Sequence, residues 1–399
     1  MALGVLMVAA LLQGAPAPVF RFEQREVSGM TGANTMDVEA ADLDADGDLD
    51  LVVAQEFKAN LVLINTEGVF APDRTLLPQP TLDDLPGPPQ LRFEGAGHDS
   101  EDVAIADFNG DGRPDIVIVS EDDVKFGRRE VHEYFLSSPT GYQRILGVLP
   151  DSEADAVVHG DVDGDSALDL VIAGAGPVIL LKGDGRGGFK DISKGLPANS
   201  RVVQDIELAD LDGDGDLDLV MGQEGGHALW LGDGRGGFTD ASDRLPDPGK
   251  VEARKVAHVD IDGDGDLDLY FSHVGWQGRS PRDRLLINQG GGRFTDATAA
   301  RIPEDDDTTL DARFADLDGD GDLDLVRASV GAVTVWLNDG MGRFSDVSAA
   351  VVPPFTGPNL AVEIQDFDGD GRPDIYVGQL RGGGGGPEIR DRLLINRKP

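Results

Sequence analysis

The chain has 399 residues, of which 40% are apolar, and its formal net charge at pH 7 is −40. The apolar content is enough for a large core, which excludes a wholly disordered chain, and the charge argues against nucleic acid and anionic membrane surfaces as partners. The absence of cysteine excludes disulfides and thiolate zinc sites.

The first 17 residues have the features of a secretory signal. An apolar run from Leu3 to Leu12 is followed by Gly14-Ala15-Pro16-Ala17, which resembles a signal-peptidase site. The run is too short to anchor the chain in a bilayer. Because no Lys or Arg precedes it, an ordinary buried strand is the alternative. We expect residues 1–17 to be a signal peptide and the protein to be secreted, periplasmic or on the cell surface, without membrane insertion beyond this segment.

An acidic motif, Asp-x-Asp/Asn-x-Asp-Gly-x-x-Asp, then recurs along the chain, and each copy leads directly into an apolar strand. Its seven copies begin at Asp42, Asp107, Asp161, Asp210, Asp260, Asp316 and Asp366. A repeat of about 50 residues is typical of architectures in which each unit buries its core against its neighbours.

One repeat shows the expected unit. Residues 206–209 predict a first strand that enters the acidic motif, and residues 217–221 predict a second strand buried on both faces. A third strand at 228–231 and a fourth from Phe238 to Pro246 follow, separated by glycine-rich turns. Four short antiparallel strands of this kind form one blade of a β-propeller.

The two ends of the chain complete this pattern. Residues 19–23 form a strand with no repeat before it, and the last repeat stops at a third strand, residues 393–396. Pairing these strands would complete the last blade and hide exposed sheet edges. The sequence therefore predicts an all-β fold: residues 18–399 form one seven-bladed β-propeller, with four antiparallel strands per blade and the N-terminal strand closing the last blade.

The acidic motif has the composition of a calcium loop. Carboxylates at positions 1, 3 and 5 can converge on one point, the glycine at position 6 permits a sharp reversal, and the position-7 carbonyl and the position-9 carboxylate complete an all-oxygen shell. Such a shell suits Ca²⁺ better than Mg²⁺. The predicted ligands of up to seven structural Ca²⁺ ions are Asp42, Asp44, Asp46, Asp48 and Asp50; Asp107, Asn109, Asp111, Arg113 and Asp115; Asp161, Asp163, Asp165, Ala167 and Asp169; Asp210, Asp212, Asp214, Asp216 and Asp218; Asp260, Asp262, Asp264, Asp266 and Asp268; Asp316, Asp318, Asp320, Asp322 and Asp324; and Asp366, Asp368, Asp370, Arg372 and Asp374.

Two other interpretations of the motif are weaker. An EF-hand requires helical flanks and a Glu at position 12, where Val53 and Met221 stand instead. An ordinary turn rich in Asp and Gly would not recur seven times in register. In the copy at Asp161, Ser166 replaces the glycine and must adopt a strained φ or reshape the turn, so we expect the weakest site there.

These motifs resemble the FG-GAP/VCBS repeat family, which includes the propeller of integrin alpha subunits. The resemblance extends over about residues 18–399. It implies that each acidic motif joins the first and second strands on the lower face of the propeller. It also implies that ligands bind the opposite, upper face, through loops between blades and between second and third strands. Adhesion is only a fold-level analogy.

Candidate ligand-binding residues lie in three irregular insertions expected on the upper face: residues 80–101, 121–132 and 273–283. Arg and Trp are frequent anchors of recognition surfaces and would suit an acidic glycan or a protein carboxylate, although ordinary loop decoration is the alternative for each. The candidates are His98, Lys125, Arg128, Arg129, His273, Trp276, Arg279 and Arg282.

Four aspartates at equivalent positions, five residues before an acidic motif, could ring the mouth of the central channel and bind a cation or a polyol. The alternative is that they are ordinary solvated residues at strand entries. These residues are Asp37, Asp102, Asp205 and Asp311.

The sequence contains no G-x-S-x-G, H-E-x-x-H or P-loop motif. We therefore expect a binding module for protein or carbohydrate. The alternatives are a polysaccharide lyase or hydrolase that uses the upper-face loops, and a purely structural surface component.

Overall fold

The computed structural model describes residues 19–27, 30, 34–78, 97–121, 124–275, 281–355, 357–380 and 390–398. The expected signal peptide, Trp276 and Arg279 lie outside these residues. Within the described residues, no helix combines the length and the apolar character needed to cross a bilayer.

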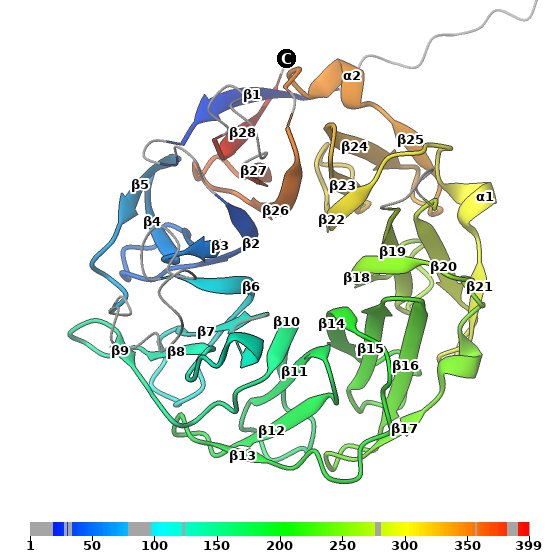
Figure 1. Cartoon of the computed structure of the whole chain (residues 1–399). Coiled ribbons are helices and arrows are strands. Elements are labelled where there is room, and N and C mark those ends of the chain that lie inside the picture. Colours follow the sequence, from blue (N-terminus) through cyan, green and yellow to red (C-terminus); the bar gives the residue numbers. More distant parts are fainter. Residues whose placement is uncertain are drawn as a thin grey trace, which may run out of the picture.

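The chain folds into antiparallel sheets arranged as a ring (Figure 1). Five of these sheets have four strands each. They contain β10 (Glu153–Gly160), β11 (Asp169–Ala175), β12 (Ile179–Gly183) and β13 (Phe189–Asp191); β14 (Val203–Ala209), β15 (Asp218–Gln223), β16 (Gly226–Gly232) and β17 (Phe238–Asp240); β18 (Glu252–Val259), β19 (Asp268–Val274), β20 (Arg284–Asn288) and β21 (Phe294–Asp296); β22 (Thr309–Ala315), β23 (Asp324–Ser329), β24 (Val333–Asn338) and β25 (Phe344–Asp346); and β1 (Arg21–Glu26) with β26 (Asn359–Gln365), β27 (Asp374–Gln379) and β28 (Arg392–Arg397).

A further sheet has eight strands. Its first half contains β2 (Thr35–Ala41), β3 (Asp50–Lys58), β4 (Leu61–Thr66) and β5 (Val69–Asp73), and its second half contains β6 (His98–Ala106), β7 (Asp115–Ser120), β8 (Glu133–Leu136) and β9 (Gln143–Arg144). The end of β3 joins the halves by pairing Glu56 with Asp99 and Lys58 with His98. His98, expected in a long exposed insertion, is instead the first residue of a strand and is 1% exposed.

The first strand of each four-strand group lies nearest the centre of the ring (Figure 1). These inner strands contact one another in a closed circle that runs through β2, β6, β10, β14, β18, β22 and β26. The second strands are buried along their length, as in β15 and β23, because both of their faces pack against neighbouring sheets. In one such interface, Val171 and Leu180 of one sheet pack with Leu219 and Trp230 of the next.

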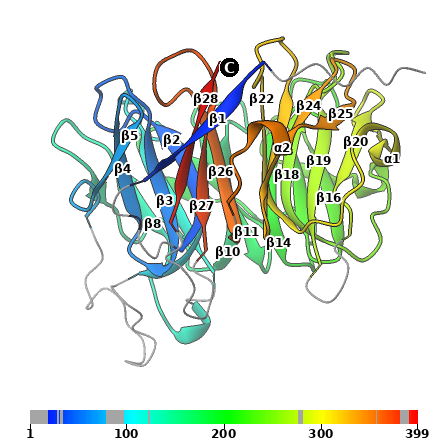
Figure 2. The same ribbon diagram turned by 90° about the horizontal axis from the view of Figure 1, so that it is seen from above.

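The two ends of the described chain meet in one sheet. β1 pairs antiparallel with β28, from Arg21 opposite Arg397 to Glu26 opposite Arg392, and the two strands lie side by side in Figures 1 and 2. Phe20 and Phe22 also pack into the core that this sheet shares with β23 and β24. The predicted pairing of the first strand with the last is confirmed, and the N-terminal strand extends beyond its predicted end.

The fourth strands are shorter than predicted. β17 ends at Asp240 instead of near Pro246, because the Asp240 carboxylate accepts hydrogen bonds from the Ser242 amide and hydroxyl, at 3.0 and 2.6 Å. These bonds turn the chain into the short helix η3 (Ser242–Arg244). The same Asp-x-Ser/Thr turn ends β21 and β25 before α1 (Thr298–Arg301) and α2 (Ser348–Val351). A last 3-10 turn, η2 (Val124–Phe126), precedes β8.

Candidate functional site

The acidic motifs occupy one face of the ring, because each connects the first and second strands of a four-strand group. We call this the acidic face. The hairpins between second and third strands, and the connections from one group to the next, lie at the opposite strand ends and form the hairpin face. The predicted position of the motif between first and second strands is therefore present in all seven copies.

The position-1 aspartate organises the loop around itself. In the copy between β14 and β15, Asp210 Oδ1 accepts the amides of Gly213 and Asp214 at 2.8 and 3.1 Å, and Oδ2 accepts that of Gly215 at 3.0 Å. Asp214 at position 5 accepts the Asp216 amide at 2.9 Å. Backbone amides thus coil the loop and hold these carboxylates in fixed orientations.

Two residues other than glycine adopt the left-handed backbone conformation in these loops. Ser166, at position 6 of the third copy, has φ 73°, which confirms the first of the two outcomes expected for it. Ala45, at position 4 of the first copy, has φ 66°, a strain the sequence reasoning did not anticipate. Each costs on the order of 1–2 kcal/mol relative to ordinary helical backbone, so the loop geometry is maintained against a local penalty.

The position-9 aspartate is the buried base of each loop. Asp218 is 1% exposed; its Oδ2 accepts the Leu211 amide at 3.0 Å and its Oδ1 accepts the Gly232 amide at 2.9 Å. This carboxylate therefore joins the acidic loop to the third strand. Equivalent pairs of bonds are made by Asp50, Asp115, Asp169, Asp268, Asp324 and Asp374.

Burial makes ionisation of this carboxylate unfavourable when no cation is near. It raises the pKa of Asp50, Asp169 and Asp218 to about 6. The pKa values of Asp268, Asp324 and Asp374 rise to about 7 for the same reason. The neighbouring carboxylates of each motif add to the effect, so a positive charge in the loop would favour the ionised form.

The Oδ1 atoms of the position-3 carboxylates give the strongest indication of a bound cation. In four copies the Oδ1 atom is buried and has no hydrogen-bond partner among the described residues; these are Asp163, Asp212, Asp262 and Asp368. Burying such an oxygen without a donor is costly. Ligand oxygens of positions 1, 3 and 9 approach within 4.8 Å of one another in the copies that begin at Asp42, Asp161 and Asp210, and those of positions 1, 3 and 5 do so at Asp260. A hard cation at that point would satisfy the orphaned oxygens, so these residues fit a divalent ion.

Basic side chains hold the second oxygen of the same carboxylates. Arg244 contacts Asp212 Oδ2 at 3.5 Å, Arg301 contacts Asp262 Oδ2 at 2.9 Å, and Arg397 contacts Asp368 Oδ2 at 2.7 Å. The outer oxygen is thereby fixed while the inner oxygen stays available. Sequence reasoning missed these residues because they are distant from the motifs along the chain.

The third copy differs, because a lysine from the neighbouring strand enters the loop. The Lys182 ammonium on β12 contacts Asp163 Oδ2 directly and Asp165 Oδ2 at 2.7 Å. A built-in cation therefore balances part of the negative charge of the motif in which Ser166 replaces glycine.

The described candidates for ligand binding do not gather in one place. Lys125 and Arg129 are exposed near η2, whereas Arg128 is buried and donates to the Gly97 carbonyl at 3.3 Å. Arg129 lies 3.7 Å from Asp151 Oδ2. On another sheet, His273 is fully buried, and Arg282 donates to the carbonyls of residues 302 and 303.

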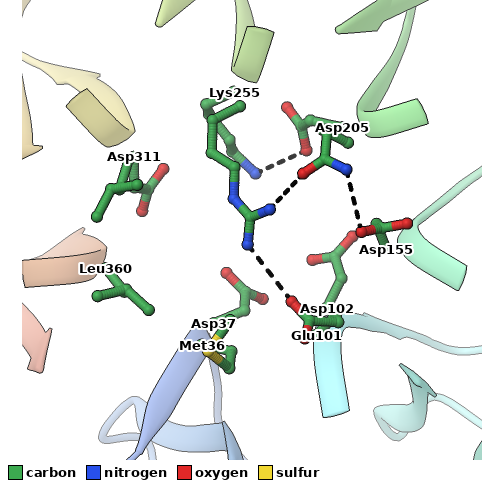
Figure 3. A pocket seen from close by; sticks show the side chains of 12 residues that line it. Met36, Asp37, Glu101, Asp102, Asp155, Asp205, Lys255, Asp311 and Leu360 are labelled. Carbon is green, nitrogen blue, oxygen red and sulfur yellow. Dashed lines mark hydrogen bonds and ion pairs between the residues drawn. The ribbon is translucent and has the colours of Figure 1, made fainter. Parts of the chain in front are cut away.

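The four equivalent aspartates do come together, around a small pocket of about 50 Å³ at the centre of the ring (Figure 3). They are largely buried instead of solvated, and each links its inner strand to the next sheet. Their Oδ2 atoms accept the amides of the next inner strand at 3.2, 2.7, 2.7 and 2.7 Å; the pairs are Asp37 with Val103, Asp102 with Val157, Asp205 with Val256, and Asp311 with Val362.

Basic residues that the sequence reasoning had not singled out enter this acidic channel. Lys255 donates to Asp205 Oδ1 at 3.0 Å (Figure 3), and Arg313 donates to Glu39 Oε1 at 2.8 Å. Arg254 lies 3.6 Å from Glu101 Oε2. All three basic residues lie on first strands. Their spacing from the acidic motif matches that of the channel acids, and this shared register could have identified them from the sequence.

One channel acid makes stability depend on pH. Glu363 on β26 is 4% exposed; it faces Asp37 and Glu39 from β2 and Arg313 from β22, and it accepts from Gln365 on its own strand. Burial, reinforced by the charge of Glu39, raises the pKa of Glu363 to about 8 from 4.5. The native state therefore binds this proton more tightly than the unfolded chain, and the resulting stability is lost as pH rises from about 4.5 to 8.

We expect Glu363→Gln to remove this dependence. The variant should be more stable than the wild type at pH 8, by on the order of 1–3 kcal/mol, and similar to it at pH near 5. Urea unfolding at both pH values measures the difference, with Glu304→Gln as an exposed control. An equal effect of Glu363→Gln at both pH values would contradict the assignment.

The FG-GAP-like repeat matches the sequence four times, at residues 161–221, 210–271, 260–327 and 316–377. Among curated proteins, no sequence matches the chain. Solved structures that it resembles include BBS1N in complex with ARL6DN, at 12% identity and TM-score 0.52 with coverage of 96% of this chain and 98% of that chain.

Two other similar structures have been solved. An extracellular domain of a one-component system from B. thetaiotaomicron has 9% identity and TM-score 0.51, covering 94% of this chain and 40% of that chain. An Agrocybe aegerita lectin specific for non-reducing terminal N-acetylglucosamine has 19% identity and TM-score 0.48, covering 91% and 86%.

At these identities the structural likeness concerns the fold alone, which is that of a β-propeller. The repeat matches are more specific, because together they run from residue 161 to 377, more than half of the chain. Each begins at the first aspartate of an acidic motif and extends through the next copy. This chain therefore belongs to the FG-GAP-like repeat family.

Proposed function

We propose that this protein is an exported, calcium-stabilised β-propeller that serves as a binding module for protein or carbohydrate. The observation that carries the calcium assignment is the set of buried position-3 oxygens without a donor, repeated on one face of the ring. In each loop the ligands would be the carboxylates or amide of positions 1, 3, 5 and 9 and the position-7 carbonyl. Calcium supplies positive charge that holds these groups together.

We further propose that the ring has seven blades. Each of the seven acidic motifs connects two strands of a separate four-strand group, and the inner strands of these groups contact one another in a circle. The eight-stranded sheet counts as two blades on this interpretation, because within the described residues its halves pair only through the short contact of β3 with β6. Residues 18–399 would then form a single domain.

The calcium assignment supports export. Loops of this type in extracellular modules have Kd values of about 10⁻⁴–10⁻³ M, so they fill in millimolar calcium and stay largely empty at cytosolic levels. The expectation of a secreted, periplasmic or cell-surface protein thus rests on the metal sites as well as on the N-terminal sequence.

The proposed recognition role depends on a difference between the two faces of the ring. The acidic face contains the acidic motifs and the basic side chains that contact them, whereas the hairpin face contains the irregular connections. Binding residues commonly lie on such loops of a rigid scaffold. Lys125 and Arg129 are exposed there and remain the proposed contacts of an acidic ligand. Buried His98, Arg128 and His273 could act only by supporting neighbouring loops.

Binding screens test this function directly. Labelled protein in millimolar calcium would be applied to arrays of neutral and acidic glycans and of extracellular proteins, with an EGTA-treated sample in parallel. We expect saturable binding without turnover of the ligand, lost when calcium is removed. Release of cleaved product from a polysaccharide, or no binding on any array, would contradict the proposal.

Lys182 provides a test within a single loop. Because its ammonium occupies the loop that begins at Asp161, we expect Lys182→Ala to free Asp163 and Asp165 for calcium and to add one bound ion per chain. Isothermal titration calorimetry of calcium-free protein would measure the change. The matched control is Lys190→Ala, an exposed lysine on β13 of the same sheet. An unchanged stoichiometry in Lys182→Ala would show that the lysine does not block the loop.

A further inference from the structure

A second surface site lies on the hairpin face beside β16, where a groove of about 860 Å³ opens. Three connections line it: residues 198–201 before β14, the hairpin between β15 and β16, and residues 240–250 between β17 and β18. We call this the β16 groove; its strands are labelled in Figure 1. It lies apart from the acidic motifs and from the insertions that the sequence singled out.

The floor of the groove contains a histidine whose hydrogen-bonding state is fixed by its neighbours. His227 is 7% exposed, stacks on Phe271 at 3.6 Å between ring centroids, and places its Nε2 3.0 Å from His273 Nε2. His273 Nδ1 lies 2.8 Å from the Arg282 carbonyl oxygen. A carbonyl can only accept, so His273 Nδ1 must carry the hydrogen, and its Nε2 must be the acceptor when the ring is neutral.

The consequence is an acceptor nitrogen on a residue that lines the groove. Burial lowers the pKa of His227 well below its ordinary value and also lowers the pKa of His273, so both rings are neutral. His227 then donates from Nε2 to His273, which leaves its Nδ1 as an acceptor. That nitrogen is buried and has no hydrogen-bond partner among the described residues. A hydroxyl group is the simplest donor that would satisfy it.

Cations stand at the rim of the groove. Arg201 and Lys250 are exposed, and neither pairs with a carboxylate within the described part of the chain. The Arg201 guanidinium lies over Gly226, where a Cβ would come within 2.1 Å of Nη1. Gly226 thus provides the space that lets this arginine reach across the groove, directly above the residue that precedes His227.

The other residues that line the β16 groove indicate which class of ligand it fits. Asp240, Asp243 and Asp247 outnumber the two basic residues, so the groove does not favour an anion. The partly exposed Pro246 and Pro248 supply apolar surface next to these donors and acceptors, over the buried side chains of Trp230 and Leu245. Closely alternating donors, acceptors and apolar patches match a sugar ring, which presents hydroxyl groups at its edge and C–H groups on its faces.

We propose that the β16 groove binds a neutral oligosaccharide, with a sugar hydroxyl donating to His227 Nδ1 and another accepting from Arg201. This inference deepens the proposed binding function and rests on it. Little in the sequence indicates this site, because its residues come from three separate connections. The adjacent glycines Gly225 and Gly226 and the isolated Arg201 were the available signals.

The test uses the full-length protein in calcium and a panel of neutral oligosaccharides built from glucose, galactose, mannose and N-acetylhexosamines. Titration calorimetry would measure affinity for the array's best neutral glycan. We expect Arg201→Ala and His227→Phe to weaken binding by about tenfold or more, the loss of one or two hydrogen bonds. His227→Phe keeps an aromatic ring against Phe271 while removing the acceptor. The matched control, Arg235→Ala, removes an exposed arginine from the turn between β16 and β17 on the acidic face and should have no effect.

The outcomes separate this inference from the broader proposal. Binding of a neutral glycan that survives Arg201→Ala with unchanged affinity would overturn the β16 groove assignment while leaving the binding function intact. Binding only to acidic glycans or to proteins would do the same. If His227→Phe lowers the melting temperature, the exposed Arg201→Ala variant decides alone, since no core contact depends on it.

Discussion

Chelation of calcium should lower the melting temperature of this protein by about 8 °C. At a tenfold excess over Kd, each filled loop contributes about 1.4 kcal/mol, and the six loops that Lys182 does not enter together contribute about 8 kcal/mol. For a chain of this length, 1 kcal/mol shifts the melting temperature by roughly 1 °C. The physical reason is the repulsion among the carboxylates of each motif, together with the burial of Asp212 and its equivalents without a donor.

Scanning calorimetry in millimolar calcium and in excess EGTA measures this shift. Magnesium added to the chelated protein serves as the control and should restore little of the loss, because it requires a smaller octahedral shell and retains its waters. Identical melting curves with and without EGTA would remove calcium from the account of stability.

The second large effect is expected at a buried ion pair between the sheets of β19 and β23. Arg327 is fully buried; its Nη2 lies 3.1 Å from Asp283 Oδ2 and its Nη1 lies 2.5 Å from Asp305 Oδ2. The guanidinium also lies over the Trp336 ring at 4.0 Å and donates to the Thr309 hydroxyl at 2.7 Å. Replacing Arg327 with Met leaves the Asp283 carboxylate buried without its cation, which typically costs 3–5 kcal/mol.

Urea unfolding of Arg327→Met measures that cost. Arg284→Ala is the matched control: this pair with Asp296, at 2.8 Å, is partly exposed, and such pairs contribute about 0–1 kcal/mol. The double variant Arg327→Met with Asp283→Asn should recover part of the loss, because it also removes the buried charge. A cost below about 1 kcal/mol for Arg327→Met would show that the hydrogen bonds donated by Tyr270, Thr309 and the His273 amide are enough to satisfy Asp283.

Much of the fold could be predicted because the same local rules act in every repeat. The acidic motif marks the end of each first strand, and the apolar run that follows marks a strand buried on both faces, as in β15. The closure of β1 on β28 followed from counting strands at the two ends. These features depend on residues close together in the chain, so the sequence contains them directly.

What could not be predicted depends on contacts between distant residues. Lys182 contacts Asp163, which lies 19 residues earlier in the chain, and no periodic pattern in the sequence predicts this contact. The pairing of β3 with β6 buries His98, which the sequence placed in an exposed insertion. The β16 groove likewise combines three connections whose proximity exists only in the folded ring.

The charged residues of the central channel could be predicted only in part. The equivalent spacing of Asp37, Asp102, Asp205 and Asp311 left two interpretations open, a ring at the channel mouth or solvated strand entries, and the four residues do come together. Their burial and their bonds to the next inner strand were not predictable, because they depend on how closely the inner strands approach one another. Lys255, five residues before its acidic motif, occupies the register of these aspartates. Arg313, three residues before its motif, occupies the register of Glu39 and Glu363. The channel therefore balances part of its own acidity.

The account depends most on whether the acidic motifs hold calcium, and the most direct measurement is the number of ions bound per chain. Calcium-free protein would be equilibrated in about 10 mM calcium, a tenfold excess over the weakest Kd expected, and the metal and protein concentrations would be determined together. We expect about six ions per chain, one for each acidic motif that Lys182 does not fill. One ion or none would contradict it.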